Sequence, residues 1–155
     1  MIRMTRLTDY GIVLLTYFAR DSHSTLHNAR DVAASARLPL PTVNKILKAL
    51  TKKGLLVSHR GVKGGYSLAR RAEDISMADI ISATEGPVAL TQCAMTEPGQ
   101  CVQESCCPVH SNWQKINAII RQALEGVKLS EMARPLPQKP SSPIRITVRK
   151  EARVL

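Results

Sequence analysis

Hydrophobic positions at helical spacing predict helices in the first part of the chain. Residues 9–20 carry such a pattern, and Thr8 stands before them as a candidate N-cap. Residues 29–36 form a shorter pattern, which Asn28 can cap together with Asp31 three positions later. Two helices are therefore expected in this part of the chain.

A third helix is predicted from Pro41, a residue that suits a first helical turn, to the glycine at position 54. Its apolar positions recur at helical intervals, at Val43, Ile46, Leu47 and Leu50. Its other side is polar and basic, with Thr42, Asn44, Lys45, Lys48, Thr51 and Lys52. A short helix, a tight break and a helix with a basic outer face outline a helix-turn-helix motif, although lysines also decorate ordinary solvated helices.

A β-hairpin is predicted directly after the third helix. Residues 55–60 and 66–70 are expected to be strands, and the glycine-rich segment 61–65 between them is too long for a two-residue turn. This segment does not fit a phosphate-binding P-loop, because neither a Lys-Ser/Thr pair nor a helix follows it at once. A basic hairpin after a helix-turn-helix predicts a winged helix, in which Arg60 and Lys63 would meet DNA phosphates or the minor groove.

Two more helices are predicted beyond the hairpin. Residues 76–85 form the first, with Ser76 as its cap and Gly86-Pro87 as its end. Residues 109–128 form the longest helical pattern, with one apolar face made of Trp113, Ile116, Ile120, Ala123, Leu124 and Val127. A second copy of the chain would cover this face in a two-fold dimer that matches a palindromic site, and packing on its own domain is the alternative for part of the face.

These elements predict a mainly α fold with a small β-wing, a winged helix-turn-helix with a long dimerisation helix. The expected divisions are a winged helix-turn-helix domain over residues 1–86, a cysteine-rich loop over 87–108, a dimerisation helix region over 109–134 and a basic, proline-rich mobile tail over 135–155.

The charge of the chain indicates what kind of partner it binds. The chain carries 22 Lys and Arg against 12 Asp and Glu, a formal net charge of +10. Residues 1–70 hold 12 of the basic side chains and 3 of the acidic ones, and residues 135–155 hold 5 and 1. Aromatic residues make up only 3%, too few to stack single-stranded bases, so duplex DNA is the expected polyanion, with a merely soluble basic protein as the alternative.

Length and hydropathy set the class of protein. A chain of 155 residues with 44% hydrophobic and 22% charged residues has the size and composition of one globular domain. It contains no run of about 18 apolar residues that could cross a membrane, and no apolar leader segment follows Met1. A cytoplasmic protein without a membrane partner is therefore expected.

All four cysteines fall in one loop-like segment: Cys93, Cys101, Cys106 and Cys107, with His110 three positions after the last. Thiolates gathered in this way in a cytoplasmic protein favour a metal or cluster over a disulfide framework. The C-x7-C-x4-C-C spacing lacks the close pairs that zinc usually takes, whereas iron–sulfur clusters accept wider spacings. An iron–sulfur cluster is the first interpretation, and zinc or a bare redox thiol pair are the alternatives.

The chain resembles the Rrf-type winged-helix repressors, a family that includes iron–sulfur cluster assembly regulators and nitric-oxide-sensitive repressors. The resemblance runs from residue 1 to about 134 and is carried by Leu7 to Gly11, Leu40 to Lys45, Arg60 to Tyr66, and the Cys93, Cys101 and Cys107 loop followed by Trp113. Within the family, the Arg60 to Tyr66 segment, Glu85-Gly86-Pro87 and the Cys-Pro before Trp113 are most similar to regulators of the SUF cluster-assembly system.

The resemblance implies a dimeric DNA-binding repressor of iron–sulfur cluster assembly genes, whose two-iron or four-iron cluster controls operator affinity. Cys93, Cys101 and Cys107 carry over as cluster ligands. The fourth ligand is His110 or Asp9 of the partner subunit, and Cys106 ranks behind both. Asp9 has a second interpretation, since a carboxylate also stabilises the first turn of a helix.

Each basic or polar side chain of the predicted DNA surface receives a role. Lys45, Lys48 and Lys52 are expected to contact phosphates, and Thr42 and Asn44 to face base edges. Arg60 is expected in the minor groove, with Lys63 beside it on the wing.

A zinc-stabilised nucleic-acid module is the first rival function for the chain. An enzyme with a nucleophilic cysteine ranks lower because no residue is seen to orient the pair of Cys107 and His110, so no enzymatic activity is expected.

Overall fold

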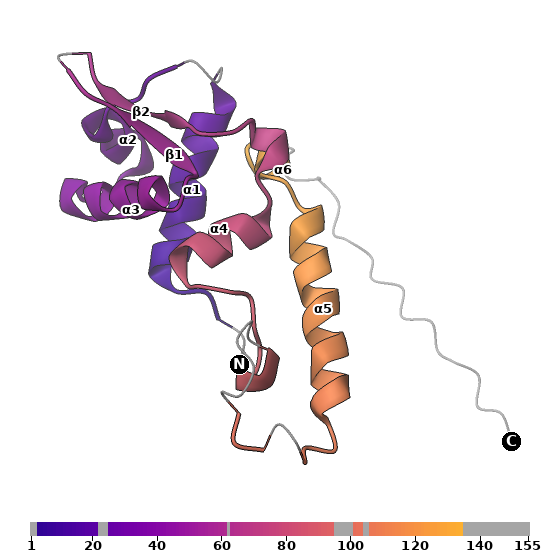
Figure 1. Ribbon diagram of the computed structural model, residues 1–155. Coiled ribbons are helices and arrows are strands. Elements are labelled where there is room, and N and C mark those ends of the chain that lie inside the picture. The colour runs from indigo at the N-terminus through magenta and orange to yellow at the C-terminus, as the bar shows by residue number, and fades with distance from the viewer. Residues whose placement is uncertain (1–2, 22–24, 62, 95–100, 104–105, 135–155) are drawn as a thin grey trace, which may run out of the picture.

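The computed structural model confirms a mainly helical chain with one small hairpin (Figure 1). It describes residues 3–21, 25–61, 63–94, 101–103 and 106–134. The elements are α1 (Arg6–Arg20), α2 (Ala29–Ala36), α3 (Leu40–Lys52), β1 (Leu56–His59), β2 (Gly65–Leu68), the 3-10 turn η1 (Ala72–Asp74), α4 (Met77–Thr84), the 3-10 turn η2 (Gln92–Ala94), α5 (His110–Gly126) and α6 (Leu129–Met132). The predicted tail over 135–155 lies outside the described residues.

Helix α1 begins earlier than predicted, and Thr8 is not its cap. Thr5 is the N-cap, and its hydroxyl accepts a hydrogen bond of 3.3 Å from the backbone N–H of Thr8. Thr8 lies inside the helix and is fully buried. Its own hydroxyl donates to the carboxylate of Glu85, a long-range contact that the local pattern could not indicate.

Helices α2 and α3 form the predicted helix-turn-helix. Asn28 caps α2 as expected, because its side-chain oxygen accepts from the N–H of Asp31 at 2.9 Å. Arg37 ends α2 in the left-handed conformation (φ 53°), and the N–H of Leu38 donates to a carbonyl of the last turn of α2. Gly54 follows α3 with a φ of 73°, the expected glycine stop.

One hydrophobic core holds the helices together. The apolar stripe of α3 is fully buried, as its spacing predicts, and it meets α1 at the centre of the molecule. Fully buried members of this core include Leu14, Leu15, Val43, Ile46, Leu47, Leu50, Ile75 and Ile80. Burying each such side chain contributes about 1.5–3 kcal/mol, so α3 and the elements packed on it rest on a rigid base.

The wing is a two-stranded antiparallel sheet, with Leu56 opposite Leu68 and His59 opposite Gly65. Both predicted strands are confirmed, each somewhat shorter than expected. The outer edge of β2 is tied to the connection between α1 and α2, because His27 and Tyr66 exchange backbone hydrogen bonds of 3.0 and 2.9 Å. The tip of the hairpin extends away from the core (Figure 1).

The far end of α5 is joined firmly to the rest of the fold. Ser76 caps α4 in a reciprocal capping box with Asp79, as its sequence predicts. Beside it, the carbonyl of Val127 accepts from Met77, and Leu129 donates to Ile75, at 2.9 and 2.8 Å. The short helix α6 then packs against α1.

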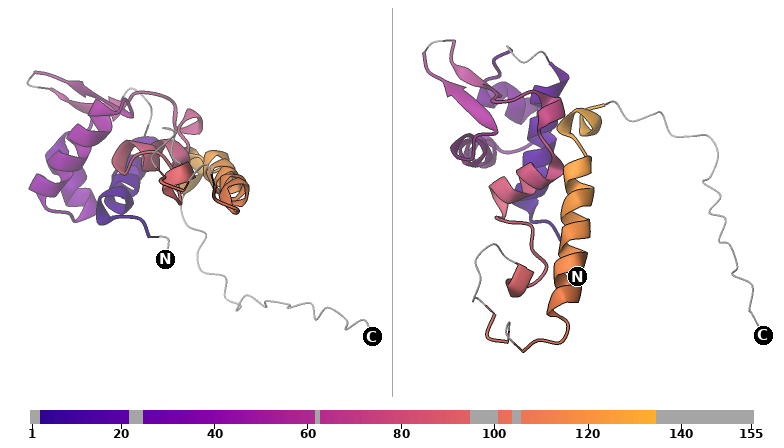
Figure 2. Two further views of the ribbon diagram at one scale, coloured as in Figure 1. Left: turned by 60° about the horizontal axis from the view of Figure 1, so that its bottom comes forward. Right: turned by 45° about the vertical axis from the view of Figure 1, so that its right-hand side comes forward.

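Helix α5 stands along the side of the molecule opposite the wing and α3 (Figure 2). Its predicted apolar face is split. Ile120 and Leu124 line a groove with Ile81 of α4, so part of the face packs on its own domain. Trp113, Ile116 and Val127 of the predicted face are 36%, 41% and 36% exposed, and Ile119, which lies outside that face, is 66% exposed.

Candidate nucleic-acid interface and cysteine loop

The outer face of α3 presents the lysines predicted for DNA. Lys45, Lys48 and Lys52 are exposed, and none forms an ion pair with another described residue. Thr42 and Asn44 are half-buried on the same helix. The three unpaired ammonium groups suit contacts with DNA phosphates, and the shorter polar side chains beside them suit contacts with base edges in a groove.

Helix α3 and the wing themselves carry no carboxylates. Between Asp31 and Glu73 the sequence contains no acidic residue. The basic residues in the same stretch are Arg37, Lys45, Lys48, Lys52, Lys53, Arg60, Lys63, Arg70 and Arg71. This stretch forms α3 and the wing, so their surface has a positive field that attracts a polyanion.

The wing tip exposes Arg60 and Lys63, as predicted. Gly61 has a φ of 112°, and its carbonyl accepts from the N–H of Gly64 at 2.9 Å. A Cβ at Gly64 would collide with the backbone carbonyl oxygen of His59. The two glycines thus allow a tight turn that brings both basic side chains to the end of the hairpin.

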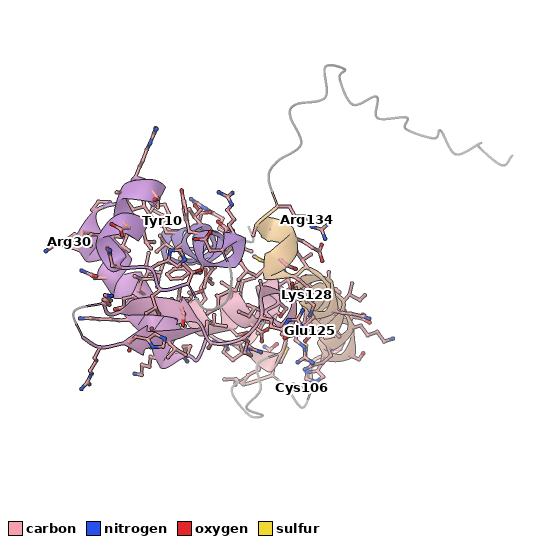
Figure 3. The ribbon with its side chains drawn as sticks, turned by 90° about the horizontal axis from the view of Figure 1, so that it is seen from above. Tyr10, Arg30, Cys106, Glu125, Lys128 and Arg134 are labelled. Atoms are coloured by element: carbon pink, nitrogen blue, oxygen red, sulfur yellow. The ribbon has the colours of Figure 1, made fainter. Side chains whose placement is uncertain are left out.

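Arg30, on the first turn of α2, is not among the residues that the sequence predicts for DNA binding. It lines a surface hollow together with Asn28, Asn44 and the carboxylate of Asp31. Figure 3 shows Arg30 on the side of the molecule away from Glu125 and Lys128. The signal was present in the basic excess of residues 1–70, but the fold was needed to place Arg30 beside α3.

A second hollow lies between α3 and the wing. Lys48 and Lys52 line it from the helix, and Ser58 and Tyr66 from the two strands. The sequence predicted the lysines but not the hydroxyl groups opposite them. Ammonium and hydroxyl donors on both walls of a shallow hollow match the chemistry of a phosphate group.

All four cysteines are free thiols. Cys106 is exposed, while Cys93, Cys101 and Cys107 are half-buried. The Sγ of Cys93 lies 3.2 Å from the hydroxyl of Thr91.

His110 begins α5, and its N–H donates to the carbonyl of Cys107 at 3.3 Å. Its Nδ1 is buried and has no hydrogen-bond partner in the part of the chain that the structure describes. Thiols and an unpaired imidazole nitrogen are donors of the type that iron–sulfur clusters take. Within the described ranges, however, no three His, Cys, Asp or Glu side chains are gathered as a metal site.

Asp9 lies in the first turn of α1 and is exposed, so its position agrees with both interpretations of this residue. At the start of the same helix, the exposed carboxylate of Glu85 binds Thr5 and Thr8. Its Oε1 accepts from the N–H of Thr5 at 2.8 Å and from the hydroxyl of Thr8. The Thr8 hydroxyl foremost, and then the Thr5 N–H, lower the pKa of Glu85 because they stabilise its charged form.

Residues 4–135 match the family model described as Rrf2, iron-dependent transcriptional regulator. The chain belongs to the Rrf2 family. This Rrf2-family chain is 27% identical over 131 residues to the HTH-type transcriptional regulator NsrR of Shouchella clausii, a match that covers 84% of this chain and 88% of that protein. The expected resemblance is thereby confirmed. The chain is a DNA-binding transcriptional regulator, and its family consists of regulators and not of enzymes.

Solved structures support the same fold. CymR, the global cysteine regulator of B. subtilis, superposes with a TM-score of 0.66 at 22% identity, over 86% of this chain and 97% of that chain. IscR of T. potens superposes with a TM-score of 0.61 at 24% identity, over 84% and 85%. The predicted winged-helix class is therefore confirmed. No helix in the described ranges is long and apolar enough to cross a membrane.

Proposed function

We propose that this Rrf2-family chain is a cytoplasmic homodimer that binds duplex operator DNA through α3 and the wing and represses iron–sulfur cluster assembly genes. The observation that carries the DNA interface is the acid-free, basic surface of α3 and the hairpin. The assignment of the target genes rests on the segments of this chain that resemble regulators of the SUF system. The sensor is a cluster held by the cysteine loop.

The DNA contacts follow from side-chain chemistry. Lys45, Lys48 and Lys52 neutralise phosphates along α3. Thr42 and Asn44 lie on the same helix, and an Asn side chain can pair with adenine in the major groove. At the wing, Arg60 enters the minor groove and Lys63 binds a neighbouring phosphate.

The test of this interface is Arg60→Ala, compared with Lys115→Ala on the exposed side of α5. Loss of one minor-groove arginine costs on the order of 1–3 kcal/mol, so the operator Kd rises about 5- to 150-fold in fluorescence anisotropy. Lys115→Ala keeps the wild-type Kd, since α5 lies on the far side from the wing. Equal affinities of the two variants at several salt concentrations would contradict the wing's role.

The homodimer is proposed from α5. Ile116 and Ile119 are large apolar side chains exposed to water on the same helix. A second copy of α5 covers both at once, because a two-fold contact pairs one patch with itself. The resulting dimer presents two α3 helices, which fits a palindromic operator with two half-sites.

The proposed cofactor is a two-iron or four-iron cluster. Its ligands would be Cys93, Cys101 and Cys107, with His110 or Asp9 of the partner subunit as the fourth and Cys106 as the weaker candidate. The free thiols and the unpaired, buried Nδ1 of His110 support this set by donor type. The family description, an iron-dependent regulator, supports iron over zinc. A bound cluster would supply reversible redox chemistry and reactivity toward oxidants and nitric oxide.

Single Cys→Ser variants test the cofactor after anaerobic purification. Serine is a harder ligand than thiolate, so iron, sulfide and visible absorption fall to near background in the variants of Cys93, Cys101 and Cys107. The variant of Cys106 keeps most of its iron. Asp9→Ala and His110→Ala then identify the fourth ligand. A colourless wild-type protein that contains zinc would contradict the proposed sensor.

A further inference from the structure

A row of polar side chains on α5 faces the cysteine loop. His110, Gln114 and Asn117 follow one another at intervals of four and three residues, so they share one side of the helix. Asn117 is the only buried residue among the 17 of α5, at 8% exposure. A buried amide on an otherwise solvated helix indicates that both ends of that amide are hydrogen-bonded.

The amides of this row hold the backbone of the segment that enters the loop. Asn117 accepts from the N–H of Leu90 at 3.1 Å and donates to the carbonyl of Val88 at 3.2 Å. One turn earlier on α5, the Nε2 of Gln114 donates to the carbonyl of Cys93. A reversed Asn117 amide would place its NH₂ against an N–H and its oxygen against a carbonyl, so the pairing is directional.

These contacts place Cys93 close to the beginning of α5. As the chain advances from residue 88 to 93, its partners on α5 move from Asn117 back to Gln114. His110 lies four residues before Gln114 on α5, about 6 Å away along the helix axis. Its N–H donates to the carbonyl of Cys107. The two ends of the loop are thus both fixed to the first turns of one helix.

We propose that Asn117 and Gln114 are positioning residues for Cys93, and that they hold it against α5 before any cluster is bound. The inference rests on the proposed function, in which Cys93 is a cluster ligand. A ligand that is already ordered loses less conformational entropy on binding, so the cluster is held more tightly. The same hydrogen bonds join the Cys93 segment mechanically to the proposed dimerisation helix.

The experiment uses the full-length apo-protein and matched controls on the same helix. Asn117→Ala and Gln114→Ala remove the two amides, and Asn112→Ala and Gln122→Ala remove exposed amides elsewhere on α5. Two readouts report on position: hydrogen exchange of the Leu90 amide, and the alkylation rate of Cys93 by iodoacetamide, measured by mass spectrometry.

We expect Asn117→Ala to accelerate Leu90 exchange about tenfold, because one buried hydrogen bond is lost. Cys93 is alkylated several times faster in both test variants, and both controls match the wild type. Asn117→Asp keeps the acceptor for the Leu90 N–H but sets a carboxylate oxygen against the carbonyl of Val88, so we expect it to restore the Leu90 protection only in part. Exchange at Leu47 in the α3 core does not change, which separates positioning from general destabilisation.

After cluster reconstitution, we expect faster loss of visible absorption under chelator in both test variants than in their controls. Wild-type rates at Leu90 and Cys93 in Asn117→Ala and Gln114→Ala would overturn the inference. So would acceleration that extends equally to Leu47. A wild-type protein that takes up no iron contradicts the proposed cofactor instead, while the apo-protein rates still decide whether the amides position Cys93.

Discussion

At the residue scale, Glu85 joins two parts of the chain that are far apart in sequence. It ends α4, and its carboxylate binds Thr5 and Thr8 at the start of α1. Thr8 also lies 2.8 Å from the hydroxyl of Thr84, so both helix ends meet in one polar cluster. The next residue, Gly86, has a φ of 98° and turns the chain toward the cysteine loop. The Glu85 carboxylate and the Thr8–Thr84 contact therefore link the position of α1 to the root of the loop.

This carboxylate makes stability depend on pH. The pKa of Glu85 is lower in the folded protein than in the unfolded chain, chiefly because of the Thr8 hydroxyl. The stabilisation is thus fully present above the unfolded pKa, and it is lost as the pH falls through the folded pKa. We expect Glu85→Gln to unfold at lower urea than the wild type at pH 7, with a difference that shrinks below the ordinary glutamate pKa.

Urea titrations at pH 7 and in the acid range measure this difference. Thr8→Val removes the dominant hydrogen bond and should reduce the same pH dependence. Glu125→Gln, an exposed carboxylate on α5, is the control for a change of net charge. A stability difference between wild type and Glu85→Gln that is constant with pH would disprove the role of the carboxylate.

At the element scale, the wing depends on close backbone packing at its tip. A Cβ on Gly64 would collide with the His59 carbonyl oxygen and would lie 2.9 Å from the Gly61 oxygen. Both neighbours are backbone atoms, so the tip must open to relieve the contact. Since Arg60 and Lys63 are carried by this turn, a change in its shape moves both basic groups.

We therefore expect Gly64→Ala to weaken operator binding by about 1 kcal/mol or more, comparable with the loss of a direct contact. The melting temperature changes little, because the tip lies away from the core. Gly126→Ala at the end of α5 is the matched control, since a Cβ there meets nothing within 4 Å. Anisotropy with operator DNA checks the prediction, and equal Kd values for the two glycine variants would show that the tip tolerates a methyl group.

At the scale of the whole molecule, the wing and the cysteine loop lie at opposite ends (Figure 1). Described contacts connect them through helices. The loop is bound to α5 by Asn117 and Gln114, and α5 leads through α6 to α1, where Arg20 donates to the carbonyl of Ala133 at 3.3 Å. Helix α1 in turn packs against α3 in the core. A change at the loop can thus reach the DNA surface as a movement of packed helices.

The proposed dimer is tested by Ile119→Asp. Ile119 is 66% exposed in the single chain, so the substitution leaves the monomer core intact. Burial of this side chain contributes about 1.5–3 kcal/mol per copy, so loss of both weakens the dimer by roughly 3–6 kcal/mol. We expect sedimentation to show a folded monomer with reduced operator affinity. Gln122→Asp on the same helix is the control, and a dimer that survives Ile119→Asp would place the interface elsewhere.

Elements with local signals could be predicted from the sequence alone. Asn28 and Ser76 were correctly predicted as caps, since a cap bonds to an N–H only three residues away. The buried stripe of α3 followed from its spacing, because a helix turns through the same angle at every residue. The basic faces of α3 and the wing were predictable for the same reason, as charges that cannot be buried must remain on the solvent side.

Contacts between residues distant in sequence became visible in the folded chain alone. Thr8 is predicted as a cap from its neighbours, yet its hydroxyl binds Glu85, 77 positions away. Arg30 lies beside Asn44 of α3 because α2 packs against α3. Asn117 is a polar position on a solvated helix until the segment 88–90 folds against it, 27 and 29 positions earlier in the chain. Such pairs leave no periodic pattern, because a hydrogen bond between remote segments depends on how the helices pack and not on the residues adjacent to either partner.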